Sequence, residues 1–294
     1  MSYSFDYRSD TAKQVRKIAR DQVEGAIDLI EAGSDFDKTV HELRRRCKKV
    51  RGLLRLVRPN FKAFDAENAQ FRDAADSLSA TRDAAVMVET YVEALDAPWA
   101  TPIASADKSR LRRILSKNAA DVAAQQDGTQ LLANFAGSMN DALQRIKDWS
   151  FKDDGFCLLA PGFRDTYARL RKGMEKAKKS GEAEDFHDWR KDAKYHWFHV
   201  SLFKACAPDV LGGRREHLDR LGELLGDHHN LFVLVETLKI LAPDAPQSII
   251  DGLLGMQDGF ADEAFALGRQ LVVETPSQMT QAMGQFWKLL PEDK

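Results

Sequence analysis

A sequence pattern occurs twice in this chain, and the two copies lie about half a chain length apart. The first copy, VHELRRRCKKVRGLLRLV, contains His41, and the second, FHDWRKDAKYHWFHVSLF, contains His187, 146 residues later. In each copy the His is followed by Arg and Lys residues. A repeat of this length indicates a duplicated structural unit, in which each copy has similar elements in the same order.

The duplication extends beyond these two segments. Downstream, LSATRDAAVMVETY aligns with LGDHHNLFVLVETL at an offset of 147, which pairs Asp83 with Asn230. Two separate segments that keep almost the same offset are hard to obtain by chance. The sequence therefore predicts a single domain of residues 1–294, built from a first repeat at 1–150 and a second repeat at 151–294.

The composition is that of a soluble protein with a large core, because 44% of its 294 residues are apolar. No segment approaches the roughly 18 uncharged residues of a membrane span, and the first residues lack the apolar stretch of a signal peptide. We therefore expect a cytoplasmic protein without membrane contact. Cys47, Cys157 and Cys206 are far apart and form no CxxC motif, so they are predicted to be free buried thiols.

Charge is segregated along the chain although the net charge is only −2. From His41 to Arg58 there are eight Lys or Arg residues and one Glu, whereas from Asp244 to the end there are eight acidic and three basic residues. Such segregation concentrates a positive field on one part of the surface. A near-neutral total argues against a general nucleic-acid-binding protein, since these usually have a strong positive excess.

Apolar residues recur at the 3.6-residue spacing of helices, between clusters of Gly and Pro, which predicts an all-α fold. Short connections between long helices favour antiparallel bundles. Breaks are predicted at Pro161-Gly162 and at Gly212-Gly213, and Asp227 is interpreted as an N-cap. The predicted helices span residues 10–32, 36–57, 62–78, 81–96, 107–125, 128–148, 162–179, 183–205, 213–225, 228–241, 245–272 and 276–289.

The predicted helix 36–57 carries two neighbouring stripes. The apolar stripe consists of Val40, Leu43, Cys47, Val50, Leu54 and Val57. A basic stripe about 100° around the helix consists of His41, Arg44, Lys48, Arg51 and Arg55. Cations at the margin of a buried face border the seam between helices, where like charges one turn apart repel by a few tenths of a kcal/mol. An anionic ligand would offset this repulsion.

The motifs in both copies resemble those of the CHAD family, the conserved histidine α-helical domain. The segment from His41 to Arg51 matches H-x-x-R-x-x-x-[RK]-[RK]-x-R, and the segment from Leu225 to His229 matches L-G-D-x-H. The resemblance covers nearly the whole chain. It implies two pseudo-symmetric antiparallel four-helix bundles around a central basic cavity, which binds inorganic polyphosphate without catalysis and often directs the protein to polyphosphate granules.

The resemblance also implies which residues contact polyphosphate. In the first repeat these are His41, Arg44, Lys48, Lys49 and Arg51, with Arg16, Arg20, Arg55 and Arg82 as further positions. In the second repeat they are His187, Arg190, Lys191, Lys194 and His229, with Arg164, Arg171 and Lys172 as further positions. Tyr195 and Trp197 occupy positions where the family usually has basic residues, so the second repeat is expected to be less charged and more aromatic.

Two other functions stay open at this stage. The His187-Asp188 dipeptide occurs in metal-dependent phosphohydrolases, but such enzymes need further His and Asp ligands, which the basic segments do not supply. A nucleic-acid-binding helical protein is the other alternative, although no groove-reading motif is present. We expect no cofactor and no metal site, and we expect structural roles for His196, His199, His217 and His228.

Overall fold

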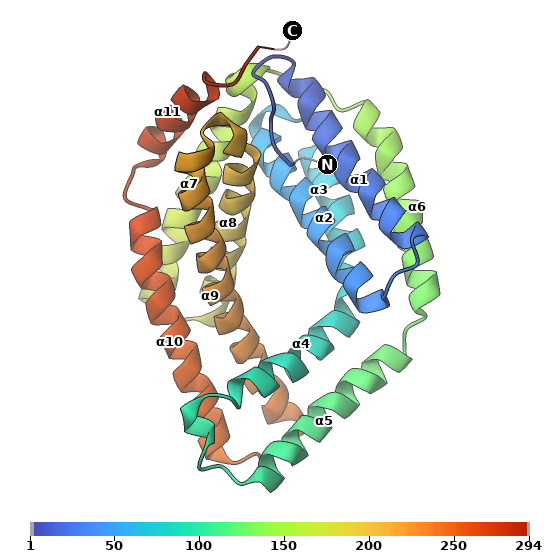
Figure 1. Ribbon diagram of the computed structural model, residues 1–294, viewed down its shortest axis with the longest axis vertical. Coiled ribbons are helices and arrows are strands. Elements are labelled where there is room, and N and C mark those ends of the chain that lie inside the picture. The colour runs from blue at the N-terminus through green and yellow to red at the C-terminus, as the bar shows by residue number, and fades with distance from the viewer. Residues whose placement is uncertain (1–2, 293–294) are drawn as a thin grey trace.

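The computed structural model describes residues 3–292, and this part of the chain is helical throughout, without a strand (Figure 1). The predicted all-α fold is confirmed. The α-helices are α1 (Thr11–Glu31), α2 (Phe36–Val57), α3 (Phe64–Asp76), α4 (Ser79–Ala94), α5 (Ser105–Ala124), α6 (Gly128–Lys147), α7 (Gly155–Ser180), α8 (Ala183–Leu202), α9 (Pro208–Leu241), α10 (Gln247–Leu271) and α11 (Pro276–Trp287). Short 3₁₀ turns are η1 (Arg58–Asn60), η2 (Pro98–Ala100) and η3 (Lys204–Cys206).

The order of helices in the two halves is compatible with a duplication. Helices α1 and α2 precede α3 and α4 in the first half, and α7 and α8 precede the single long helix α9 in the second. The prediction of two helices at 213–225 and 228–241 is therefore wrong. Helix α9 runs without a break from Pro208 to Leu241, through Gly212-Gly213 and through the predicted gap after residue 225. Asp227, predicted to be an N-cap, lies inside α9.

The continuity of α9 has a physical reason. Each Gly inside a helix costs only about 1 kcal/mol relative to Ala. Leucines on both sides of the glycine pair are buried, among them Leu211, Leu218 and Leu225. Their burial stabilises one continuous helix by more than the glycines destabilise it, at roughly 1.5–3 kcal/mol for each fully buried side chain.

The predicted break at Pro161-Gly162 is also wrong, because Pro161 lies inside α7. Proline has no N–H, so it cannot donate to the carbonyl of the residue four positions earlier, Cys157. The side chain of Asn60 donates to this carbonyl instead, at 3.1 Å. A buried amide from the first half therefore replaces the missing hydrogen bond of the second.

The two halves meet where α2 approaches α7 and α8. At Gly52 an added Cβ would lie 2.8 Å from the Cβ of Phe198, and at Gly162 it would lie 2.0 Å from the carbonyl oxygen of Leu56. Nε2 of the buried His199 also lies 3.0 Å from the Gly52 carbonyl oxygen. The helices approach this closely because glycine has no side chain.

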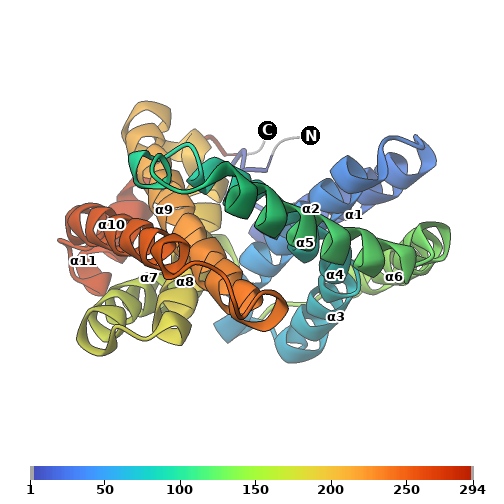
Figure 2. The same ribbon diagram turned by 90° about the horizontal axis from the view of Figure 1, so that it is seen from below.

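Apolar side chains form two clusters, and both contain residues from both halves. The larger cluster joins α1, α2 and α6 to α7, α8 and the first part of α9. The smaller cluster joins α4 and α5 to the last part of α9 and the first part of α10. Helices α4 and α5 thus reach across to the second half and close the molecule at one end, as both views show (Figures 1 and 2).

The three cysteines are free, but only Cys47 and Cys206 are buried. The prediction of buried thiols is wrong for Cys157, which is exposed near the start of α7. Within residues 3–292, no helix combines the length and the apolar character that crossing a membrane requires.

Candidate anion-binding site

Helix α2 presents its cations beside the place where the two halves meet. The helix begins after Asp35, whose side chain accepts a hydrogen bond from the Lys38 backbone N–H at 3.0 Å. Its apolar stripe is buried, which fixes the rotation of the helix and the direction of the basic stripe. Lys48 lies four residues before the contact at Gly52, about 6 Å along the helix axis.

Cations from both halves surround Lys48. Burial, followed by the positive charges of Arg44, Arg190 and Lys194, lowers the pKa of Lys48 to about 8. Lys48 nevertheless keeps solvent-exposed surface. We call the region around Lys48, where the charges of Arg44 from α2 and of Arg190 and Lys194 from α8 act on one amine, the recess. The basic rows of α2 and α8 therefore face each other at Lys48.

Two glycines of α9 accommodate the cations of α8. An added Cβ at Gly222 would lie 2.6 Å from Cε of Lys194, and one at Gly226 would lie 3.4 Å from Nη2 of Arg190. Both glycines are one helical turn apart, so they lie on the same face of α9. This role was not predicted, although Gly222 and Gly226, at positions i and i+4 of a leucine-rich segment, are a signal that the sequence contains.

The rings of His187 and His229 pack against each other at a tilt of 39° beside Arg190, with their centroids 4.6 Å apart. Burial, followed by the charges of Arg190 and the neighbouring His187, lowers the pKa of His229 to about 4. Burial also lowers the pKa of His187, followed by the charges of Lys191 and Arg190. In the ligand-free protein both rings are therefore neutral at pH 7, and at this pH they contribute hydrogen bonds rather than charge.

Carboxylates compensate part of this positive charge. They are Asp83 at 3.9 Å from Arg44, Asp188 at 2.6 Å from Lys191, Asp219 at 3.2 Å from Lys194, and Asp227, whose charge acts on Arg190. Among the described residues, no carboxylate lies within the 4.0 Å ion-pair distance of Lys48 or Arg190. These two cations face the recess without an ion-pair partner.

The remaining cations of the α2 stripe continue toward the end of the helix. Arg51 donates from Nε to the side chain of Asn68 at 3.3 Å. The Arg55 guanidinium lies 4.0 Å from the ring centroid of Tyr195, and Lys194 Nζ lies 5.3 Å from that of Trp197. Tyr195 and Trp197 of α8 therefore provide ring faces for one cation of each half.

Several cations that the resemblance implicates lie elsewhere or have other partners. Arg16 donates to the carbonyl of Trp149, Lys49 lies over the ring of Tyr3, Arg82 pairs with Glu89, and Arg171 donates to the carbonyls of Val272 and Glu274. The side chains of His41, Arg20, Lys172 and Lys191 are exposed, as that of Lys48 is, and among these Lys191 pairs with Asp188. Arg16, Lys49 and Arg171 use backbone and ring contacts that sequence spacing does not indicate.

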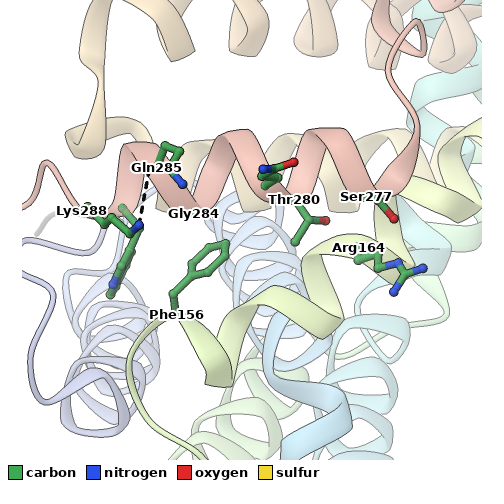
Figure 3. A pocket seen from close by; sticks show the side chains of 9 residues that line it. Phe156, Arg164, Ser277, Thr280, Gly284, Gln285 and Lys288 are labelled. Carbon is green, nitrogen blue, oxygen red and sulfur yellow. Dashed lines mark hydrogen bonds between the residues drawn. The ribbon is translucent and has the colours of Figure 1, made fainter.

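Arg164 lies in a depression of about 480 Å³ between α7 and α11. Figure 3 shows its guanidinium below Ser277 and Thr280, with Phe156 and Lys288 further along the same groove. Arg164 is thus grouped with residues of α11, and the structure does not bring it to the recess around Lys48. Across residues 3–292, no group of three or more His, Cys, Asp and Glu side chains has a geometry that could hold a metal ion.

Comparison with known proteins identifies the family. The model of the CHAD domain matches residues 14–239. Among solved structures, PptA from Streptomyces chartreusis has a TM-score of 0.57 and 12% identity, covering 93% of this chain and 100% of PptA. The crystal structure of the CHAD domain from the plant Ricinus communis has a TM-score of 0.49 and 17% identity, covering 99% of this chain and 96% of the plant domain. No match was found among curated proteins. The family model spans most of the chain, and this protein therefore belongs to the CHAD family.

Proposed function

We propose that this protein binds inorganic polyphosphate, without hydrolysing it, in the recess between α2 and α8. The observation that supports this proposal is the environment of Lys48, where Arg44 from the same helix and Arg190 and Lys194 from α8 all depress its pKa. Clustered like charges destabilise the ligand-free protein, so an anion that lies among them is bound favourably. Membership of the CHAD family adds to this argument.

A linear polyphosphate fits the spacing of the cations. Its phosphates carry roughly one negative charge each, and cations on one helix face recur about every 5.4 Å. Arg44 and Arg190 provide forked donors for phosphate oxygens, whereas Lys48 and Lys194 provide point charges. Binding energy is then distributed over many contacts, each worth more than an exposed ion pair because the recess is partly desolvated.

Binding is expected to weaken steeply with salt, because each phosphate contact releases counterions. Long-chain polyphosphate should be titrated into the protein at rising NaCl concentrations. A plot of the logarithm of the association constant against the logarithm of the NaCl concentration should be linear with a negative slope. The polymer should be recovered intact afterwards.

Two results would support the alternative functions. Phosphate release that requires Mg²⁺ or Mn²⁺ and is lost in His187→Ala would establish a hydrolase. Displacement of polyphosphate by duplex DNA at equal charge concentration would favour nucleic-acid binding. Association with polyphosphate granules would follow from the same affinity.

The pH dependence of binding should report the titration of Lys48. The free protein loses this charge as the pH rises through about 8, whereas a bound anion favours the protonated amine. Affinity is therefore highest below pH 8 and decreases by about 30-fold between pH 7 and pH 9.5. In Lys48→Arg the guanidinium stays charged over this range, so the decrease should largely disappear in calorimetric titrations. An unchanged decrease in that variant would show that other groups titrate.

A further inference from the structure

Asp83 is a carboxylate whose negative charge acts on two cations of the recess, Arg44 and Lys48. It lies in the second turn of α4, and its Oδ1 is 3.9 Å from Nη2 of Arg44. Its charge also raises the pKa of Lys48, in opposition to the surrounding cations. Asp83 therefore acts on both Arg44 and Lys48, although its own side chain is 67% exposed.

Asp83 is not needed to hold Arg44 in place. The other terminal nitrogen of Arg44, Nη1, donates to the Ala75 carbonyl at 2.9 Å, which is a well-formed hydrogen bond. The contact with Asp83 is a full ångström longer and exposed to solvent, so its geometric contribution is small. What Asp83 contributes to the recess is mainly its negative charge.

The second half differs at the corresponding position. The repeat pairs Asp83 with Asn230, a neutral amide of the same shape. The two segments around these residues are also built differently, because α4 begins after a break that follows α3, whereas Asn230 lies inside the continuous helix α9. A carboxylate at this repeat position therefore occurs in the first half alone, whereas Asp219 and Asp227 act on the cations of α8 from other positions.

We propose that Asp83 is a resident counterion, which competes with the bound anion for Arg44 and Lys48 and sets the minimum charge of ligand that the recess accepts. This inference rests on the proposed polyphosphate binding. An anion must outcompete a carboxylate that is already present at high local concentration. Orthophosphate, with about two charges, gains little binding energy when it displaces Asp83 from Arg44 and Lys48. A polyphosphate makes additional contacts with Arg190 and Lys194, and these offset the cost of displacing Asp83.

The test is a titration of tripolyphosphate and orthophosphate into the wild type and Asp83→Asn at low salt. Loss of the competing charge should raise the affinity for tripolyphosphate by about three- to fivefold, with the gain shrinking as salt screens the interaction. Asp83→Glu keeps the charge and should bind like the wild type. Orthophosphate binding should become measurable only in Asp83→Asn.

Asp153→Asn is the matched control, because it makes the same change of charge on an exposed loop residue. Asp153 is also distant from Lys48. Its neighbour Lys152 donates its backbone N–H to the carbonyl of Asn60, which lies beyond the end of α2 and about 18 Å from Lys48 along the helix axis. Lower affinity in Asp83→Asn would show a positioning role, and a gain no larger than that of Asp153→Asn would show a general charge effect. Either result overturns the inference while leaving wild-type polyphosphate binding intact. If the wild type itself does not bind tripolyphosphate or longer chains, the proposed function fails as well.

Discussion

The double variant Arg44→Glu with Lys48→Glu should lose polyphosphate affinity by a factor on the order of 100 or more. The two substitutions replace two positive charges by two negative ones beside Arg190 and Lys194, the cations that α8 contributes. The new carboxylates would act as counterions for these residues and would repel the ligand. Because they also relieve the repulsion among the native cations, the variant should remain folded, which circular dichroism would verify.

The control for this variant is Arg269→Glu with Lys288→Glu, which makes the same total change of charge at exposed positions on α10 and after α11. Long-range electrostatics should lower its affinity only a few-fold at physiological ionic strength, where the Debye length is about 8 Å. Equal losses in both double variants would contradict a localised site and would indicate that polyphosphate binds to the surface as a whole.

Gly162→Ala should destabilise the fold by about 3 kcal/mol or more. A Cβ at this position would lie 2.0 Å from the carbonyl oxygen of Leu56 and 2.6 Å from that of Arg55, so the backbone of α2 would have to move. Flexible side chains cannot relieve a contact between a Cβ and a backbone carbonyl. Urea or thermal unfolding should show the loss, with a decrease in Tm of about 6 °C or more.

Gly213→Ala is the matched substitution inside another helix. An added Cβ at Gly213 meets nothing within 4 Å, so the variant should be stabilised by about 0.5–1 kcal/mol through the higher helix propensity of Ala. A Gly162→Ala variant with the stability of the wild type would show that α2 and α7 do not approach as closely as described. A destabilised Gly213→Ala variant would contradict the continuous helix α9.

Helices that show a clear apolar periodicity within their own sequence could be predicted. Helical periodicity places α1, α2 and α8 within a few residues of their observed bounds. The basic stripe of α2 follows from the same periodicity, because burial of Leu43, Cys47 and Val50 fixes which residues face the margin. Amphipathic spacing is a property of one helix, so it can be read without knowing the partner.

Features that depend on a partner far along the chain could not be predicted. Pro161 indicates a break unless Asn60, 101 residues earlier, is known to satisfy the carbonyl of Cys157. In the sequence, Arg171 cannot be distinguished from the other cations of the pattern. Its guanidinium nevertheless donates a hydrogen bond to the carbonyl of Val272, 101 residues later. Only the tertiary structure reveals such hydrogen bonds between distant segments, which override local propensity.

A crystal structure with bound tripolyphosphate is the most direct test of the central claim that α2 and α8 form one anion site. The account predicts phosphate oxygens within hydrogen-bond distance of both Lys48 and Arg190, with Asp83 displaced from Arg44. Anions bound instead in the groove of Arg164, or to α2 alone with no phosphate shared with α8, would contradict it.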